Sequence, residues 1–414
     1  MKILIDATTT QDQYASRGIG RVTKELVTAL VERSAKMNTE DQYRLLLFNA
    51  PTSLNDLVQK FPSRVRTVNI GRLRLSGKLN SLWWQWQYAP AIRREMKTEK
   101  PDIYLCPNIL RGFPSRKIPV VGMVHDFAFH RVGRFSLGPR WLDWVRRFQY
   151  QRSYSRLRRV SGIATISENT KKDLYTYVPG LKKPIVKTVY LGLSPSFRRR
   201  KTNVAIVGKY LPRRVIDQGY ILYYGGLEAN KNVPAIVHSY AELRRMWEKK
   251  FGNTLICPYL VLAGGDFTQH DMSHPILAEI RDLITALNLE EEVCFTGFYD
   301  DNHTVHLLNA ARLFIHLSLY EGFGFSPLEA MRCGVPVVAS DRSCYPETLG
   351  DGALLVNPER PHVVAKACLR ILTDEQVCAN LTTAGMIKAA GYTWNSTAKN
   401  MAELFEEVVR KGGK

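Results

Sequence analysis

Two glutamates with seven residues between them, Glu321 and Glu329, are the residues of this chain best placed for ligand chemistry. An apolar strand precedes Glu321, and a second apolar strand runs from Val335 to Ala339. Between these strands we expect a glycine-bearing turn and a short helix that opens at Ser326. Parallel sheets bind ligands at the carboxyl ends of their strands, and helix N-termini favour phosphate. The pattern predicts capture of a ligand with phosphate and several hydroxyls, such as a nucleotide sugar.

The same segment has a purely structural interpretation. Ser326 and Glu329 have the spacing of a capping box, with Pro327 at the first helical position. Glu329 would then accept a hydrogen bond from the backbone N–H of Ser326, and Glu321 would be a solvated loop residue. For either glutamate taken singly, the sequence leaves both interpretations open.

Glycines and a lysine form a second candidate site. Gly225 and Gly226 follow the strand expected at 220–224, and Lys231 comes five residues later. Glycines allow the backbone to approach a diphosphate closely, and lysine supplies a point charge. Gly18 and Gly20 lie between the first expected strand and a helix, where a tight turn with close helix packing is the alternative.

Other candidate residues follow strands elsewhere in the chain. His125 and Asp126 end an apolar strand, where an isolated histidine commonly has a structural role. Ser167 has the position of a plain helix N-cap, and we favour that interpretation. Gly265 ends a strand, and Phe298 belongs to a segment that would place backbone groups against a base.

Taken as whole strings, these segments resemble a known family. Residues 309–347 resemble the Glu-x7-Glu signature of retaining GT-B glycosyltransferases of family 4. Residues 223–232 resemble that family's Gly-Arg-Leu-x-x-x-Lys-Asn phosphate loop, although Gly226 stands where many members have Arg. The resemblance implies an α/β protein of the GT-B fold, with two doubly wound Rossmann-like domains facing a central cleft.

The resemblance also implies a domain plan. Residues 1–200 would form the acceptor-binding domain and residues 218–395 the nucleotide-sugar-binding domain, with a basic linker at 194–219. The C-terminal helix, within 396–414, would pack back on the first domain. The chain length agrees with two domains of about 200 residues each.

The family's site residues carry over to matching positions here. Glu321 would accept hydrogen bonds from the sugar, Glu329 would bind the ribose hydroxyls, and Lys231 would face the diphosphate. The catalytic residues implied are His125, Asp126 and Glu321. The donor-binding residues implied are Gly18, Gly20, Gly226, Lys231, Gly265, Phe298, Gly322, Phe323, Gly324, Phe325 and Glu329. Because no Asp-x-Asp motif stands in a convincing loop, we expect neither a metal nor another cofactor.

The same resemblance narrows the range of candidate substrates. The Gly18-Ile-Gly20-Arg21, His125-Asp126 and Gly225-Gly226 segments together most resemble bacterial mannosyltransferases of surface-polysaccharide assembly. GDP-mannose is therefore the first donor, with UDP-glucose, UDP-N-acetylglucosamine and dTDP-rhamnose left open. The acceptor would be a lipid-linked or oligosaccharide glycan. A GT-B-shaped epimerase or hydrolase that acts on the nucleotide sugar is the enzymatic alternative.

Charge is distributed unevenly along the chain. Residues 1–210 carry 39 Lys and Arg against 14 Asp and Glu, whereas residues 211–414 carry 19 against 24. Aromatic residues are interleaved with the basic ones in two stretches, 72–97 and 131–159; they include Trp83, Trp84, Trp86, Trp141 and Trp144. This pattern predicts a cytoplasmic protein that binds peripherally to an anionic membrane, on the inner membrane face. A basic nucleic-acid-binding protein is the rival, but no known nucleic-acid motif supports it.

Composition excludes several other classes. No run approaches the roughly 18 apolar residues of a membrane span, and the start reads as a first strand, not a signal peptide. The seven cysteines form no CxxC pair, which predicts reduced and mostly buried thiols. Strands are expected at 2–7, 43–48, 65–70, 101–105, 119–125, 160–166, 186–190, 220–224, 259–263, 292–296, 313–317 and 335–339.

Overall fold

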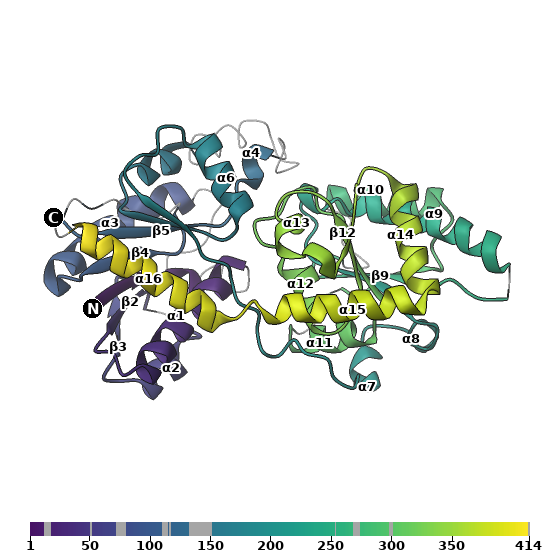
Figure 1. Ribbon diagram of the computed structural model, residues 1–414, viewed down its shortest axis with the longest axis horizontal. Coiled ribbons are helices and arrows are strands. Elements are labelled where there is room, and N and C mark those ends of the chain that lie inside the picture. The colour runs from purple at the N-terminus through teal and green to yellow at the C-terminus, as the bar shows by residue number, and fades with distance from the viewer. Residues whose placement is uncertain are drawn as a thin grey trace. The chain divides into compact units, whose positions relative to one another are not determined.

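The computed structural model describes residues 1–11, 18–49, 52–71, 80–109, 115, 117–131, 151–252, 254–267, 274–297 and 301–412, with the side chains of all of these except 80–87 and 301. Two compact units make up the chain, each built on its own parallel sheet (Figure 1). The first unit comprises residues 1–127, 139–192 and 392–414. The second comprises 128–138 and 193–391.

The first unit contains a seven-stranded sheet in the order β3-β2-β1-β4-β5-β6-β7, with every pair parallel. Its strands are β1 (Lys2–Asp6), β2 (Gln42–Leu47), β3 (Val65–Asn69), β4 (Ile103–Cys106), β5 (Val120–Val124), β6 (Gly162–Thr165) and β7 (Ile185–Thr188). Its helices are η1 (Thr8–Thr10), α1 (Gly18–Lys36), α2 (Asn55–Lys60), α3 (Asn80–Glu99), α6 (Glu168–Tyr177) and α16 (Trp394–Gly412). The strands β4 and β5 are buried throughout because helices cover both faces of such a sheet.

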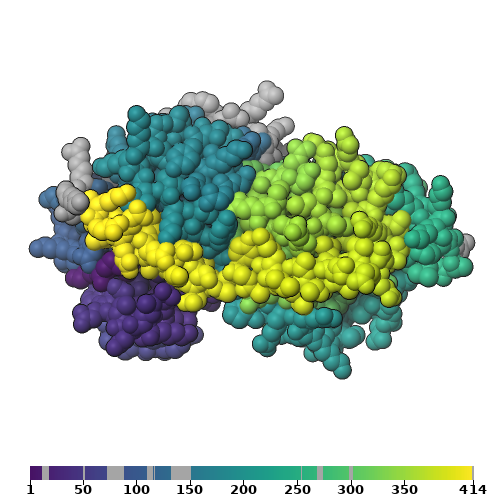
Figure 2. Space-filling model, in the orientation of Figure 1, coloured from purple at the N-terminus to yellow at the C-terminus, as the bar shows by residue number. Residues whose placement is uncertain are grey.

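The C-terminal helix α16 belongs to the first unit. It packs against α1 and β6, and Figure 2 shows it in yellow at the surface of this unit. Its buried residues recur at helical spacing, from Trp394 through Met401 to Val408. A Cβ at Gly162 would lie 2.7 Å from the Val408 side chain, so glycine allows the helix to approach β6 closely. This placement agrees with the return expected for the last helix.

The second unit contains a six-stranded parallel sheet in the order β10-β9-β8-β11-β12-β13. Its strands are β8 (Tyr220–Tyr224), β9 (Tyr259–Ala263), β10 (Val293–Phe295), β11 (Leu313–His316), β12 (Val337–Ser340) and β13 (Leu354–Val356). Its helices are α4 (Ala128–Arg131), α7 (Val204–Val207), α8 (Arg213–Gln218), η2 (Ala229–Lys231), α9 (Val233–Phe251), α10 (Pro275–Ala286), α11 (Asp301–Ala310), α12 (Phe325–Arg332), α13 (Tyr345–Thr348), η3 (Gly350–Gly352), α14 (Pro361–Thr373) and α15 (Glu375–Ala390).

One apolar cluster forms the core between this sheet and the helices α9, α10 and α14. It takes alternate residues from the strands, such as Ile221 and Tyr223 of β8 and Leu313 and Ile315 of β11. The helix α12 packs against α15, and both contact the sheet. Packing on these helices fixes the loops at the strand ends.

Three sequence expectations need correction. The segment 194–219 is not a free linker: it forms α7 and α8 and belongs to the second unit. Its Tyr210 hydroxyl lies 2.7 Å from Nδ1 of His303 on α11. The short strand β13 was not predicted, and the unit division falls at Gly192 and Leu193, not at residue 200.

Two further expectations can be compared with the structure. Four cysteines are buried and three are partly buried, and all seven are free thiols, as predicted. Within the described ranges, no helix is both long and apolar enough to cross a membrane.

Candidate active site

Most of the predicted donor residues lie in the segments that follow β8 and β11. The strand order of the second sheet reverses between β8 and β11, since β9 continues on one side of β8 and β12 on the other side of β11. Ligands of open α/β sheets bind at the carboxyl ends of the strands beside such a reversal. Lys231 follows β8, and Glu321 follows β11, so both lie at this edge.

Lys231 and Glu321 form an ion pair across the reversal. The Lys231 Nζ lies 2.6 Å from Glu321 Oε1, and the Ser318 hydroxyl donates to the same oxygen at 2.9 Å. The Lys231 and Glu321 side chains are only 21% and 16% exposed. Burial alone raises the pKa of the Glu321 carboxyl, but the Lys231 charge, His316 and these hydrogen bonds together hold it below its ordinary value. Glu321 is therefore an anion at neutral pH.

Backbone and amide contacts hold the two loops together. The Asn230 side chain donates to the Tyr320 carbonyl at 3.0 Å, and the Leu319 N–H donates to the Asn230 carbonyl at 2.8 Å. Asn232 adopts a left-handed conformation with φ of 54° and caps α9. Its amide donates to the Leu317 carbonyl at 3.3 Å. Lys231 is thus fixed between two asparagines that bond to the neighbouring loop.

A third loop clasps Glu321 from the side of β12. The Ser343 hydroxyl donates to the Glu321 carbonyl at 2.6 Å and accepts from the Glu321 N–H at 3.2 Å. Ser343 has φ of 56°, an uncommon conformation for a residue other than glycine. Such strain persists where surrounding structure imposes it. The two bonds fix the backbone that carries the Glu321 carboxylate.

Gly324 begins the helix α12 at this edge. It is the N-cap residue, with φ of 85°, and no side chain caps the helix. A Cβ there would lie 2.6 Å from the Tyr345 ring, so the position requires glycine for space as well as conformation. The alternative interpretation of Ser326 and Glu329 as a capping box is wrong, because the helix begins at Phe325 and places Ser326 inside its first turn. The first N–H groups of α12 are therefore not satisfied by a capping side chain.

The remaining predicted residues of this segment lie on or beside α12. Glu329 is in its second turn and is 1% exposed. Phe323 is also buried, and its ring packs edge-on against Phe325 with centroids 5.2 Å apart. Gly322 is buried in the same turn. The two phenylalanine rings pack against each other within this segment.

A buried histidine and tyrosine support the loop from beneath. The Tyr345 hydroxyl lies 2.7 Å from Nδ1 of His316, and the His316 ring stacks on Tyr223 with centroids 5.3 Å apart. Burial, opposed by Glu321 and reinforced by Lys231, lowers the pKa of His316 to about 3. The imidazole is neutral at physiological pH, so Nδ1 can accept from Tyr345.

The glycine turns at β8 and β9 lie against each other. A Cβ at Gly264 would come within 2.3 Å of the Gly225 carbonyl oxygen, and Gly264 has φ of 154°. Gly265 is exposed beside it. Beside Gly226, where many family members have Arg, the structure places the Glu228 carboxylate instead: a Cβ would lie 2.3 Å from its oxygen. Lys231 and the first N–H groups of α12 offer positive charge at this edge.

His125 and Asp126 lie in the first unit, directly after β5. The His125 Nε2 lies 2.7 Å from the Pro107 carbonyl oxygen, so this nitrogen carries the proton. Burial lowers the pKa of His125, although the bond to Pro107 and the nearby Asp126 oppose the shift. Asp126 is exposed. His125 is therefore a neutral side chain with Nδ1 as an acceptor.

The glycines Gly18 and Gly20 open α1 instead of preceding it. A Cβ at Gly18 would meet nothing within 4 Å, so packing does not require glycine there. Ser167 caps α6 by accepting from the Thr170 N–H at 3.0 Å, as the structural interpretation predicted. Phe298 lies outside the described residues.

Sequence reasoning missed the residues that support the site. His316 lies within the strand predicted at 313–317, Ser318 directly follows that strand, and Ser343 belongs to no motif. Tyr345 stood in a flanking Tyr-Pro-Glu string that could have drawn attention to it. Ser318 and Ser343 bond to Glu321, and Tyr345 bonds to His316, which only the folded chain reveals.

Two family descriptions together match most of the chain. Residues 16–197 match Glycosyltransferase Family 4, and residues 213–387 match Glycosyl transferases group 1. The chain belongs to the family 4 glycosyltransferases and has the GT-B fold.

Individual proteins resemble it at low identity. An O-antigen chain mannosyltransferase B of Escherichia coli is 26% identical over 93% of this chain and 94% of its own length. The E. coli serotype-specific mannosyltransferase WbdA is 23% identical over 99% of this chain, which spans 48% of that protein. A sucrose-phosphate synthase of Thermosynechococcus elongatus has a similar structure, with a TM-score of 0.75, 18% identity and coverage of 99% and 100%.

Proposed function

We propose that the protein transfers mannose from GDP-mannose to a glycan acceptor in surface-polysaccharide synthesis, with retention of configuration. The full-length match to an O-antigen chain mannosyltransferase supports the sugar and the acceptor class. The observation that carries the proposal is the Lys231–Glu321 pair beside the N-terminus of α12. This arrangement offers positive charge to a diphosphate and a fixed carboxylate to sugar hydroxyls.

Each part of the donor has a proposed partner. Lys231 and the first N–H groups of α12 stabilise the diphosphate as its bond to the sugar breaks. Glu321 accepts hydrogen bonds from the sugar hydroxyls, and Glu329 binds the ribose. Because Lys231 and Glu321 face each other at 2.6 Å, the donor enters by sharing or replacing their contact.

The chemical step we propose is front-face displacement. The bond between the sugar C1 and the phosphate oxygen breaks, and a bond from the acceptor oxygen to C1 forms on the same face. The acceptor hydroxyl proton passes to the leaving nucleoside diphosphate. His125, neutral with Nδ1 as an acceptor, is assigned to the sugar, and Asp126 to the acceptor hydroxyl.

We further propose that no divalent metal is needed, since a lysine and helix N–H groups can neutralise the diphosphate. Transfer should then persist after dialysis against EDTA and without added magnesium. A turnover that disappears with EDTA and returns with magnesium would contradict this.

Membrane binding is the last part of the proposal. Arg158 and Arg159 are exposed, whereas Arg146, Arg147 and the tryptophans of the basic stretches lie outside the described side chains. Each basic residue near an anionic leaflet contributes about 1 kcal/mol. Co-sedimentation should increase with anionic lipid, decrease with salt, and weaken on Arg158→Ser with Arg159→Ser. Equal binding to neutral vesicles would contradict it, and preference for RNA would favour the nucleic-acid alternative.

The decisive experiment is a calorimetric panel of GDP-mannose, UDP-glucose, UDP-N-acetylglucosamine and dTDP-rhamnose. GDP-mannose should bind most tightly, and labelled donor with an oligomannose acceptor should give an elongated α-linked product. Tighter binding of a different nucleotide sugar would identify that compound as the donor in place of GDP-mannose. Release of free or epimerised sugar without an acceptor would establish the epimerase or hydrolase alternative.

A further inference from the structure

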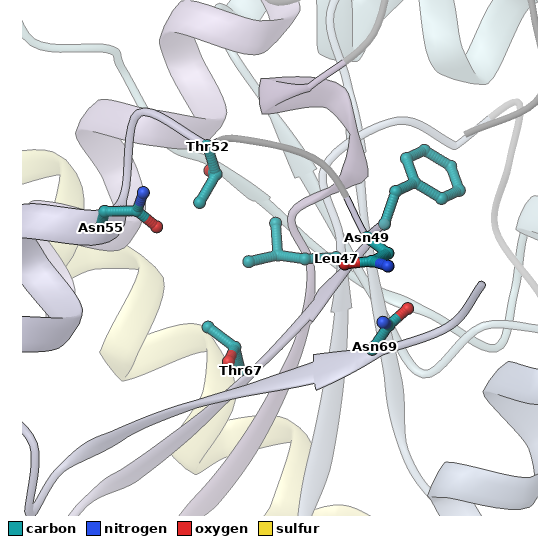
Figure 3. Close-up of a pocket in the computed structure, with 7 residues that line it drawn as sticks. Leu47, Asn49, Thr52, Asn55, Thr67 and Asn69 are labelled. Atoms are coloured by element: carbon teal, nitrogen blue, oxygen red, sulfur yellow. The ribbon is translucent and has the colours of Figure 1, made fainter. Parts of the chain in front are cut away.

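A separate pocket of about 400 Å³ lies within the first unit, at the carboxyl ends of β2 and β3. Figure 3 shows Leu47 at its centre, with Thr52 and Asn55 on one side and Thr67 and Asn69 of β3 on the other. A volume of this size falls in the range of small-molecule sites, about 300 to 1,000 Å³. None of its lining residues was predicted from the sequence to bind a ligand.

The strand register explains why these side chains meet. β2 and β3 are parallel, with Leu45 opposite Thr67 and Leu47 opposite Asn69. Alternate residues of a strand share a face, so Thr67 and Asn69 stand beside Leu47. Asn49 continues the same alternation just beyond the end of β2. The pocket therefore has an apolar floor and a polar rim fixed by the sheet.

Hydrogen bonds hold the frame of the pocket in place. The Gln11 side chain accepts from the Phe48 N–H at 2.8 Å and donates to the Phe48 carbonyl at 3.2 Å. The Asn49 N–H donates to the Gly71 carbonyl, and the Gly71 N–H donates to Asn69 Oδ1, both at 2.8 Å. The frame is thus formed without a ligand.

The rim nevertheless keeps unused hydrogen-bonding groups. Within the described structure, the side chains of Asn49, Asn55 and Thr67 make no recorded hydrogen bond, and Asn69 uses only its oxygen. Each primary amide offers two donors and an acceptor. Among the described residues that line the pocket, none has a charged side chain. Uncharged amides and hydroxyls of this kind suit a neutral ligand with many hydroxyls.

We propose that this pocket is a carbohydrate subsite that binds a neutral sugar unit of the acceptor glycan. The proposal rests on the proposed function in that it identifies the ligand as part of the acceptor. The Asn49 and Asn55 amides bind adjacent hydroxyls of the ring, and Thr67 adds a third contact. Binding a sugar unit here lets the enzyme prefer an acceptor of several sugars over a single one.

The test uses the full chain and two neutral probes, mannotetraose and maltotetraose, with saturation-transfer NMR and calorimetry. The wild type should bind at least one tetrasaccharide. Asn49→Ala combined with Asn55→Ala removes two neutral hydrogen-bonding partners and should weaken that binding about tenfold. Asn395→Ala is the matched control, because Asn395 is an exposed asparagine on α16 with no recorded side-chain hydrogen bond. GDP-mannose affinity should not change in any of these variants.

The outcomes separate this inference from the proposed function. Unchanged tetrasaccharide affinity in the double variant, with an unchanged melting temperature, overturns the subsite. Failure of the wild type to bind either probe, while it binds GDP-mannose and transfers sugar, also overturns it. In a third outcome, GDP-mannose fails to bind while the tetrasaccharide binds in a way that requires Asn49 and Asn55. That result would support the subsite and would contradict the proposed donor.

Discussion

The carboxyl edges of the two sheets are built in contrasting ways. At the edge of the second sheet, a partly buried lysine and glutamate are bonded to each other and to neighbouring loops. At the edge of the first sheet, beside β2 and β3, uncharged amides surround an apolar floor and keep their hydrogen-bonding capacity. Both units share one parallel architecture, so the fold does not dictate this difference.

Under the proposals above, the two edges bind different ligands, a diphosphate at the second sheet and a neutral sugar at the first. A charged ligand such as a diphosphate requires opposite charge held in place in advance, which the second unit provides through cross-linked loops. A neutral sugar requires amides and hydroxyls that are free to bond. The predictions below test this contrast, beginning with the largest effect.

Replacing the lysine should disable the charged edge. Lys231→Ala should weaken GDP-mannose binding by about 1.5 to 3 kcal/mol, because it removes a charge-assisted contact with the diphosphate. The control is Lys249→Ala, an exposed lysine in the last turn of α9. Calorimetry should show loss of affinity only for Lys231→Ala. Equal affinity in the two variants would remove Lys231 from the donor site.

Replacing the glycines at the starts of α12 and α1 with alanine should affect the stability of the protein to different extents. Gly324→Ala should destabilise the protein by about 2 kcal/mol. The alanine would have to adopt a left-handed backbone conformation, and its Cβ would meet the Tyr345 ring. Gly18→Ala should leave stability within about 0.5 kcal/mol, since a Cβ there meets nothing within 4 Å. Thermal denaturation measures both.

Activity then decides the role of Gly18. If its backbone faces the ligand, Gly18→Ala should lower turnover although the fold is unchanged. Wild-type turnover in that variant would show that Gly18 does not contribute to the site.

Acid should weaken the charged edge through His316. Its folded pKa of about 3 lies below the unfolded value of about 6.5, so the unfolded chain binds the proton first as pH falls. Stability is therefore lost from pH 6.5 downward, and this group alone contributes a loss of about 2 kcal/mol by pH 5. Urea denaturation of His316→Asn should lack that component. An equally steep decline in the variant would assign the loss to other groups.

The smallest effect concerns the clasp. Ser343→Ala removes both hydrogen bonds to the Glu321 backbone. It should lower the free energy of unfolding, or raise the activation free energy of turnover, by about 1 kcal/mol. Ser343→Gly loses the same bonds but relieves the strain at φ of 56°, so its stability should fall less. A greater loss for glycine than for alanine would show that strain is not stored at this position.

Strand positions followed directly from the sequence. Apolar runs between polar segments identified β8 and β9 with their observed bounds and the other strands to within a few residues, except β13, which was not predicted. Motif spacing also placed Lys231, Glu321 and Gly324 at strand ends of the second unit. Local pattern sufficed here because buried parallel strands need continuous apolar runs.

Other features depended on the three-dimensional fold. The segment 194–219 resembled a linker because it is basic and contains prolines, yet contacts such as Tyr210 with His303 attach it to the second unit. The start of α12 moved to Phe325 because Gly324 adopts the left-handed conformation that Tyr345 leaves space for.

By itself, the sequence determined all strands but β13, the family and the identity of the charged residues, because these depend on local pattern. Only the tertiary structure decided that Ser343 and His316 support Glu321, and that Asn49, Asn55 and Thr67 share one pocket. Register across β2 and β3, and loop contacts across β11 and β12, join residues far apart in the chain. No spacing rule encodes such contacts, since they arise from how strands pair and pack.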